Sequence, residues 1–137
     1  MTARKTVLIA GATGLVGHAA MQHFSDLPET DVIAVSRRRP AETFGARFIP
    51  VDLRDRAHCA QVFGAMGAIT HVVYAALYEK PGLVAGWRED DQIAINDAML
   101  RNLMELLLAA AKGLQHVSLL QGTKAYGVHA RPMRYPA

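Results

Sequence analysis

The sequence contains very little cysteine and few aromatic residues, and it has no long hydrophobic run. Cys59 is the only cysteine among 137 residues, which excludes an internal disulfide and fits a reducing cytoplasm. We expect Cys59 to be a passive thiol, because no motif around it makes it a nucleophile. No apolar run approaches the ~20 residues needed to cross a bilayer, so we expect no membrane association.

The chain is nevertheless apolar enough to fold. Hydrophobic residues make up 51% of it, which indicates a globular protein rather than a disordered one. Its 137 residues suit one domain, residues 1–137, and hardly two. The basic residues at the N-terminus precede a short apolar run that ends at Gly11, so we expect a first strand there rather than a signal peptide.

Positive charge exceeds negative charge only slightly, with a net charge of +3. The densest positive segment is Arg37-Arg38-Arg39. No interleaved aromatic residues and no nucleic-acid-binding motif accompany it, so we expect no nucleic-acid partner. We also predict no metal site.

Strand and helix patterns alternate along the chain. Short segments rich in valine and isoleucine predict strands at 6–10, 31–36, 47–52, 70–75 and 116–120. Longer segments predict helices at 15–27, 54–66 and 90–112, the last one ended by Gly113 in the left-handed cap position. Pro50 indicates either an edge position or an irregular pairing for the third strand. Such alternation is typical of a parallel sheet covered by helices on both faces.

We therefore predict an α/β fold, a Rossmann-like doubly wound parallel sheet of about five strands. Because sheets of this kind typically have about six strands, we expect this one to be incomplete at the C-terminus and to lack a substrate-binding part. An open sheet and exposed apolar helix faces favour self-association into a homo-oligomer.

The most informative motif follows the first predicted strand, where glycines stand at every third position. Gly11 permits a tight turn, Gly14 lets the backbone approach a phosphate, and Gly17 lets the next helix pack closely on the strand. Unpaired N–H groups at that helix N-terminus attract an anion. A purely structural turn is the alternative. The motif predicts that a dinucleotide pyrophosphate binds at Gly11, Thr13, Gly14, Leu15, Val16 and Gly17.

The end of the second predicted strand indicates which dinucleotide suits the site. An Asp or Glu there would bind the ribose 2′-hydroxyl of NAD(H), but the chain reads Ser36-Arg37-Arg38, and Asp31 is at the wrong end of the strand. Guanidinium groups form paired, charged hydrogen bonds to a 2′-phosphate. The sequence therefore favours NADP(H), bound by Ser36, Arg37 and Arg38, with Arg39 left to solvent.

Further residues at the strand ends complete the predicted cofactor site. Asp52 and Leu53 could flank the adenine, although an Asp that starts a helix fits equally well. Ala75 and Ala76 are small enough for the cofactor to lie across the end of the fourth strand. Asn96 falls on an apolar stripe of the long helix, either as a satisfied buried amide or as an amide beside the active site that holds backbone or water.

These segments together resemble the short-chain dehydrogenase/reductase superfamily. Within it, the chain is similar to the extended, atypical branch of progesterone 5β-reductase and iridoid synthase, called the PRISE family. The block Gly-Thr-Lys-x-Tyr-Gly at residues 122–127 is the most specific part of the resemblance. The other parts are the glycine motif, Ser36-Arg37-Arg38, residues 70–74, and Asn96 with residues 99–102.

The resemblance implies an NADPH-dependent reductase that adds hydride to the β-carbon of an enone. Lys124 matches the family's active-site lysine, which would orient the cofactor and lower the pKa of a catalytic tyrosine by charge proximity. That tyrosine lies in a motif downstream of this position in the family, and Tyr126 does not match it. We therefore expect this chain alone to bind cofactor without turnover.

Three functions stay open at this point. The first is the cofactor-binding portion of an enone reductase whose substrate is a small molecule. The second is a non-catalytic module that binds or senses NADP(H). The third is an epimerase or dehydratase of the extended superfamily, which typically uses NAD(H) and which Arg37 and Arg38 disfavour.

Overall fold

The computed structural model describes residues 4–79 and 90–121. In these residues the strands are β1 (Lys5–Ala10), β2 (Thr30–Ser36), β3 (Arg47–Pro50), β4 (His71–Tyr74) and β5 (His116–Leu119). The helices are α1 (Leu15–Ser25), α2 (Arg56–Phe63) and α4 (Asp90–Ala110).

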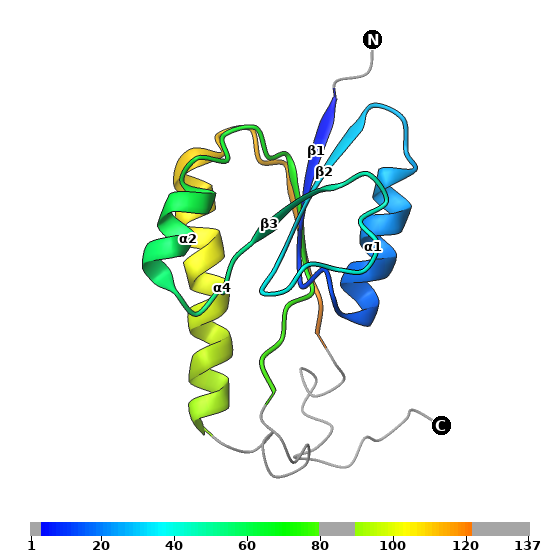
Figure 1. Ribbon diagram of the computed structural model, residues 1–137. Helices are drawn as coiled ribbons and strands as arrows, with labels where there is room; N and C mark the ends of the chain where they lie inside the picture. Colours follow the sequence, from blue (N-terminus) through cyan, green and yellow to red (C-terminus); the bar gives the residue numbers. More distant parts are fainter. Residues whose placement is uncertain (1–3, 80–89, 122–137) are drawn as a thin grey trace, which may run out of the picture.

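The strands form a five-stranded sheet in the order β3-β2-β1-β4-β5, and every neighbouring pair is parallel. Helix α1 covers one face of the sheet, whereas α2 and α4 lie side by side on the other (Figure 1). The predicted Rossmann-like α/β fold is confirmed. The strand order reverses between β1 and β4, which creates the switch point where such folds bind ligands.

The central strand β1 is buried on both faces. Leu8 packs into the core beneath α2 and α4, whereas Val7 and Ile9 pack into a second core beneath α1. All three side chains are at most 2% exposed. This explains why the first strand reads as a continuous apolar run rather than an alternating one.

Four predicted helix boundaries were wrong: α1 ends at Ser25 rather than at residue 27, α2 ends at Phe63 rather than at residue 66, and the start of α2 and the end of α4 also differ. Helix α2 begins at Arg56 rather than at residue 54, because the Asp55 side chain caps it by accepting a hydrogen bond from the His58 N–H (3.1 Å). Helix α4 ends at Ala110, and Gly113 does not adopt the predicted left-handed conformation. The turn after the helix is closed by Leu114 N–H donating to the Ala111 carbonyl (3.2 Å), which does not require left-handed backbone at Gly113.

The predicted edge position of Pro50 is confirmed, because β3 is the outermost strand beside β2. Apolar side chains are exposed on α4 at Leu108 and on β5 at Val117 and Leu119. Self-association through such residues stays a prediction. Within residues 4–79 and 90–121, no helix is long and apolar enough to cross a membrane.

Tyr74 ends β4 with its ring in the core beneath α2 and α4. Its hydroxyl is buried and has no hydrogen-bond partner in the described part of the chain. Burial raises the pKa of Tyr74 to about 12, so the phenol stays protonated near neutral pH. An unpaired buried hydroxyl costs free energy.

We expect Tyr74→Phe to leave the free energy of unfolding unchanged or to raise it by up to about 1 kcal/mol, because it removes an unpaired polar atom. Leu103→Ala, at a fully buried site in the same core, should lower it by about 2–5 kcal/mol. Denaturant unfolding of both variants measures these values. A loss above about 1 kcal/mol for Tyr74→Phe would show that the hydroxyl has a partner.

Candidate cofactor site

A cavity of about 220 Å³ lies where the carboxyl ends of β1, β2 and β4 meet the segment after β3. Several residues of the predicted cofactor site line it: Gly11, Thr13, Gly14, Ser36, Arg37, Asp52, Leu53, Ala75 and Ala76. Others that line it were not predicted: Val35, Val51, Arg54, Leu77, Tyr78 and Met99. The structure thus brings segments from five separate parts of the chain to one place.

Two glycines of the motif are required by packing within the chain, and the third is not. Gly11 has φ +88°, and a Cβ there would lie 2.6 Å from the Ala75 carbonyl oxygen. A Cβ at Gly17 would overlap the Gly11 carbonyl group. At Gly14, by contrast, a Cβ would meet only the Gly11 oxygen at 3.5 Å, an ordinary contact. Packing within the chain therefore explains Gly11 and Gly17 but not Gly14, which lines the cavity.

Helix α1 begins beside this cavity with no side-chain cap. Gly14 is its N-cap residue, no side chain accepts a hydrogen bond there, and the first turn carries no acidic residue. The first N–H groups of a helix lack intrahelical partners, so this end is suited to an anion. Gly17 is buried, whereas the side chains of Leu15 and Val16 are exposed and do not line the cavity. Any role of these three in binding would use their backbone.

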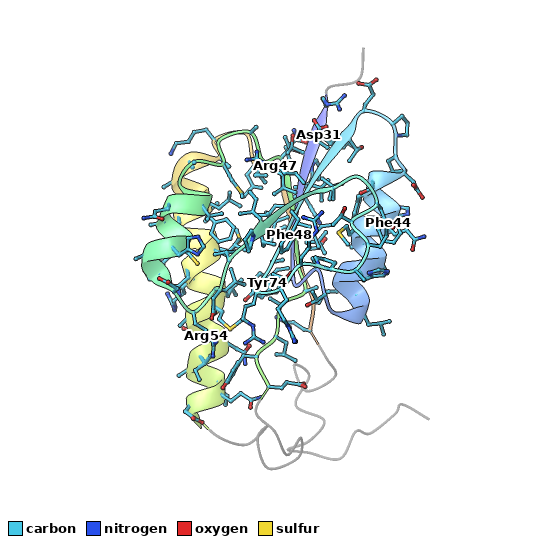
Figure 2. The ribbon with its side chains drawn as sticks, in the orientation of Figure 1. Asp31, Phe44, Arg47, Phe48, Arg54 and Tyr74 are labelled. Atoms are coloured by element: carbon cyan, nitrogen blue, oxygen red, sulfur yellow. The ribbon has the colours of Figure 1, made fainter. Side chains whose placement is uncertain are left out.

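At the end of β2, the chain presents arginine rather than a carboxylate. Arg37 lines the cavity and Arg38 does not. The Ser36 hydroxyl donates a hydrogen bond to the Arg38 carbonyl (2.6 Å), which fixes the turn that carries both arginines. Asp31 lies at the opposite end of β2 (Figure 2), where Arg4 binds it. It therefore cannot serve as the ribose-binding acid.

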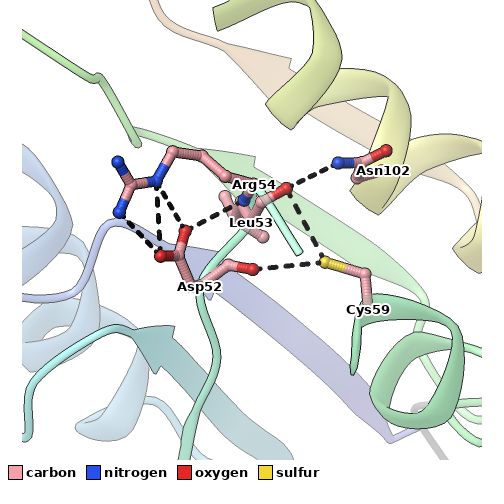
Figure 3. Close-up of polar contacts among 5 residues, drawn as sticks. All are labelled: Asp52, Leu53, Arg54, Cys59 and Asn102. Carbon is pink, nitrogen blue, oxygen red and sulfur yellow. Dashed lines mark hydrogen bonds and ion pairs between the residues drawn. The ribbon is translucent and has the colours of Figure 1, made fainter. Parts of the chain in front are cut away.

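Asp52 forms a bidentate ion pair with Arg54 (Figure 3). The Arg54 Nη2 lies 2.8 Å from Oδ2 of Asp52, and Nε lies 3.0 Å from Oδ1. The hydrogen bonds from Arg54 and its charge, with a smaller effect of the Arg37 charge, hold the pKa of Asp52 below its usual value. The alternative reading of Asp52 as the first residue of a helix is wrong, because Asp55 caps α2.

The segment that carries Asp52 is held from behind by two helices (Figure 3). From α4, the buried Asn102 amide donates to the Leu53 carbonyl at 2.8 Å. From α2, the Cys59 thiol contacts the carbonyls of Asp52 and Leu53 at 3.7 and 3.8 Å. Burial raises the pKa of Cys59 to about 11, which agrees with a passive thiol. In the sequence, Asn102 stands beside the apolar Leu103 and three residues after Met99, which marks a polar residue near buried positions but does not reveal its partner.

Asn96 holds backbone, which was one of its predicted alternatives. Its Oδ1 accepts from Tyr78 N–H (2.8 Å), and its Nδ2 donates to the carbonyls of Tyr78 (2.9 Å) and Gln92 (3.0 Å). Tyr78 lines the cavity, and the Arg54 guanidinium lies 5.1 Å from the centre of its ring. Asn96 therefore supports the cavity wall without lining it. A direct role of Asn96 beside a cofactor stays a prediction.

The predicted active-site Lys124 lies outside the described residues, as does the whole block at 122–127. The described site therefore consists of cofactor-binding candidates only.

The fold is that of a Rossmann-type domain, with a cavity at the switch point of its parallel sheet. A short chain dehydrogenase from Burkholderia cenocepacia J2315, solved in complex with NADP, has a TM-score of 0.71 at 12% identity and covers 84% of this chain and 52% of its own. The ligand-free aldohexose dehydrogenase of Thermoplasma acidophilum has a TM-score of 0.60 at 22% identity, covering 79% and 44%. At such identities the likeness shows the fold.

Residues 7–136 match the NAD dependent epimerase/dehydratase family, and the chain belongs to that family. A 3-oxo-Delta(4,5)-steroid 5-beta-reductase of Arabidopsis thaliana is 32% identical over 127 residues, covering 87% of this chain and 31% of the relative. An (S)-8-oxocitronellyl enol synthase of Antirrhinum majus is 27% identical over 133 residues, covering 91% and 32%. These relatives confirm the predicted similarity to the progesterone 5β-reductase and iridoid synthase branch. The chain spans about a third of the length of the curated relatives it matches.

We expect Gly17→Ala to lower the free energy of unfolding by about 1–3 kcal/mol, because its new methyl group would overlap the Gly11 carbonyl. This outweighs the gain of about 1 kcal/mol that alanine normally brings to a helix. Gly113→Ala is the matched control, since a Cβ there meets nothing within 4 Å. Thermal and denaturant unfolding compare the two. Equal stability of both variants would contradict the close approach of α1 to β1.

Proposed function

We propose that this chain binds NADP(H) and forms the cofactor-binding portion of an oxidoreductase. The reaction proposed for the longer protein is reduction of the activated C=C bond of a small-molecule enone by 1,4-hydride addition. A cytoplasmic location is part of this proposal, in keeping with a single buried thiol.

One observation carries the choice of cofactor. At the switch point of the sheet, the cavity presents Arg37 at the end of β2, and Asp52, the one carboxylate among the described residues that line it, is bound by Arg54. A 2′-phosphate is a partner for a guanidinium, whereas a 2′-hydroxyl calls for a free carboxylate. The NADP bound by one structural neighbour supports the same choice for the fold.

The residues of the site fit such a ligand. The free N–H groups at the start of α1 would receive the pyrophosphate, and the missing side chain at Gly14 leaves room for it. Ala75 and Ala76 keep the end of β4 open. When bound, NADPH supplies a hydride. By resemblance to the family, Lys124 would help to orient the bound cofactor.

The names of the relatives support the enone part of the proposal. One is named a 3-oxo-Delta(4,5)-steroid 5-beta-reductase and another an (S)-8-oxocitronellyl enol synthase. An epimerase or dehydratase, the other class in the family description, would be favoured by tighter binding of NADH than of NADPH.

We expect the chain to bind NADPH more tightly than NADH, and Arg37→Ala to weaken NADPH binding about ten- to hundredfold while NADH binding stays unchanged. The loss corresponds to charged hydrogen bonds worth about 1.5–3 kcal/mol. Fluorescence titration of the reduced cofactors measures both constants. Arg47→Ala is the control, because it removes the same charge at the far end of the sheet (Figure 2). Equal losses from both variants would contradict the assignment of Arg37.

Gly14→Ala separates binding from folding. Because its Cβ would make only an ordinary contact within the chain, the melting temperature should change little. The methyl group would occupy space that the pyrophosphate needs, so NADPH and NADH should both bind at least about tenfold more weakly. Unchanged binding would place the pyrophosphate elsewhere. A large loss of stability would contradict the open space at Gly14.

A further inference from the structure

Three charged residues from two neighbouring strand ends meet at one side of the cavity. Arg37 follows β2, and Asp52 and Arg54 follow β3. The register pairs Ser36 with Pro50, and the Val51 N–H donates to the Ser36 carbonyl (3.0 Å). The parallel pairing therefore continues one step past the strands and brings the segments with Arg37 and Asp52 together.

Asp52 has two cations near it but binds only one of them. Arg54 reaches both carboxylate oxygens, at 2.8 and 3.0 Å, and its own backbone N–H also donates to Oδ1 at 3.0 Å. Among the described residues, the charge of Arg37 acts on the same carboxylate, but Arg37 forms no ion pair or hydrogen bond with it. Arg37 therefore keeps its hydrogen-bond donors for another partner, while Arg54 holds the acid.

Arg54 is itself fixed from the other side. Its guanidinium lies over the Tyr78 ring at 5.1 Å, and Asn96 holds both backbone polar groups of Tyr78. A planar guanidinium that is paired with a carboxylate and stacked on a ring has little freedom to turn elsewhere. The Asp52–Arg54 pair is therefore a fixed part of the cavity wall.

We propose that Arg54 is a positioning residue that sets the preference for NADP(H) over NAD(H) without contacting the 2′-phosphate. By occupying both oxygens of Asp52, it keeps that carboxylate from pairing with Arg37 and offsets a negative charge that would repel the phosphate. The inference rests on the proposed function, since it concerns the same cofactor site. It assigns the preference to three residues, of which only Arg37 would touch the distinguishing phosphate.

A double-mutant cycle over Asp52 and Arg54 tests this inference. Dissociation constants for NADPH and NADH are measured for the wild type, Arg54→Ala, Asp52→Asn and the double variant. In the ratio of the two dissociation constants, the effects of contacts that both cofactors share, such as those to adenine and pyrophosphate, cancel. Arg54→Ala should lower the preference for NADPH at least about tenfold, since the freed carboxylate turns to Arg37. The double variant should return to within about threefold of the wild-type ratio, because no carboxylate then competes.

The matched control is Arg101→Ala, which breaks another Asp–Arg pair, Asp97–Arg101 on α4, with the same 2.8 Å separation and outside the cavity lining. It should leave the ratio unchanged. Circular dichroism and melting curves show that each variant is folded.

Two results would overturn the inference. If Arg54→Ala leaves the ratio unchanged, Arg54 does not set the preference. If the double variant keeps the lowered ratio, Arg54 binds the phosphate directly. Both results leave the proposed function intact, because the wild type still prefers NADPH. If the wild type does not prefer NADPH, the proposed function itself is contradicted. The wild-type titrations show this before any variant is compared.

Discussion

The backbone contact between Gly17 of α1 and Gly11 after β1 is the constraint on which the site depends. It lets α1 start directly against the central strand, so the helix N-terminus lies at the carboxyl edge of the sheet. The turn at Gly11 is equally confined, by its left-handed backbone and by the Ala75 carbonyl from the neighbouring strand β4. One tight junction thus sets the position of three elements, and the cavity is the space that remains beside it.

Electrostatics would give this space the preference for NADP(H) that we propose. The Asp52–Arg54 pair is partly exposed, and exposed ion pairs contribute little to stability. Its proposed role is therefore in cofactor preference, where the pairing of Asp52 with Arg54 would leave Arg37 available. Because the backbone behind that carboxylate is held by Asn102 and Cys59, its position does not depend on the surface pair alone. Buried side chains of α2 and α4 thus help to hold Asp52 in place in the site.

Much of the fold could be predicted because it follows from local patterns. The buried strands, the glycine motif and the arginines after β2 are contiguous in sequence, and their roles follow from spacing. The roles of Arg54 and Asn102 could not be predicted in this way. Asn102 contacts Leu53 across 49 residues, and the direction in which the Arg54 side chain turns toward Asp52 does not follow from their spacing. The predicted start of α2 was wrong for a related reason: Asp52 and Asp55 are both suitable cap residues, and the structure has Asp55 in that role.

The parallel sheet has a kinetic consequence. At the start of β1 and β4, the Thr6 N–H donates to the Thr70 hydroxyl, 64 residues away in sequence. The residues that line the cavity likewise come from segments far apart in the chain. Contacts so distant in sequence form late, because loop closure must be completed before they contribute. A nucleotide that needs all these walls can bind only after the sheet has closed. It would then slow the opening of the whole sheet rather than of one loop, so occupancy of the site would govern the lifetime of the folded chain.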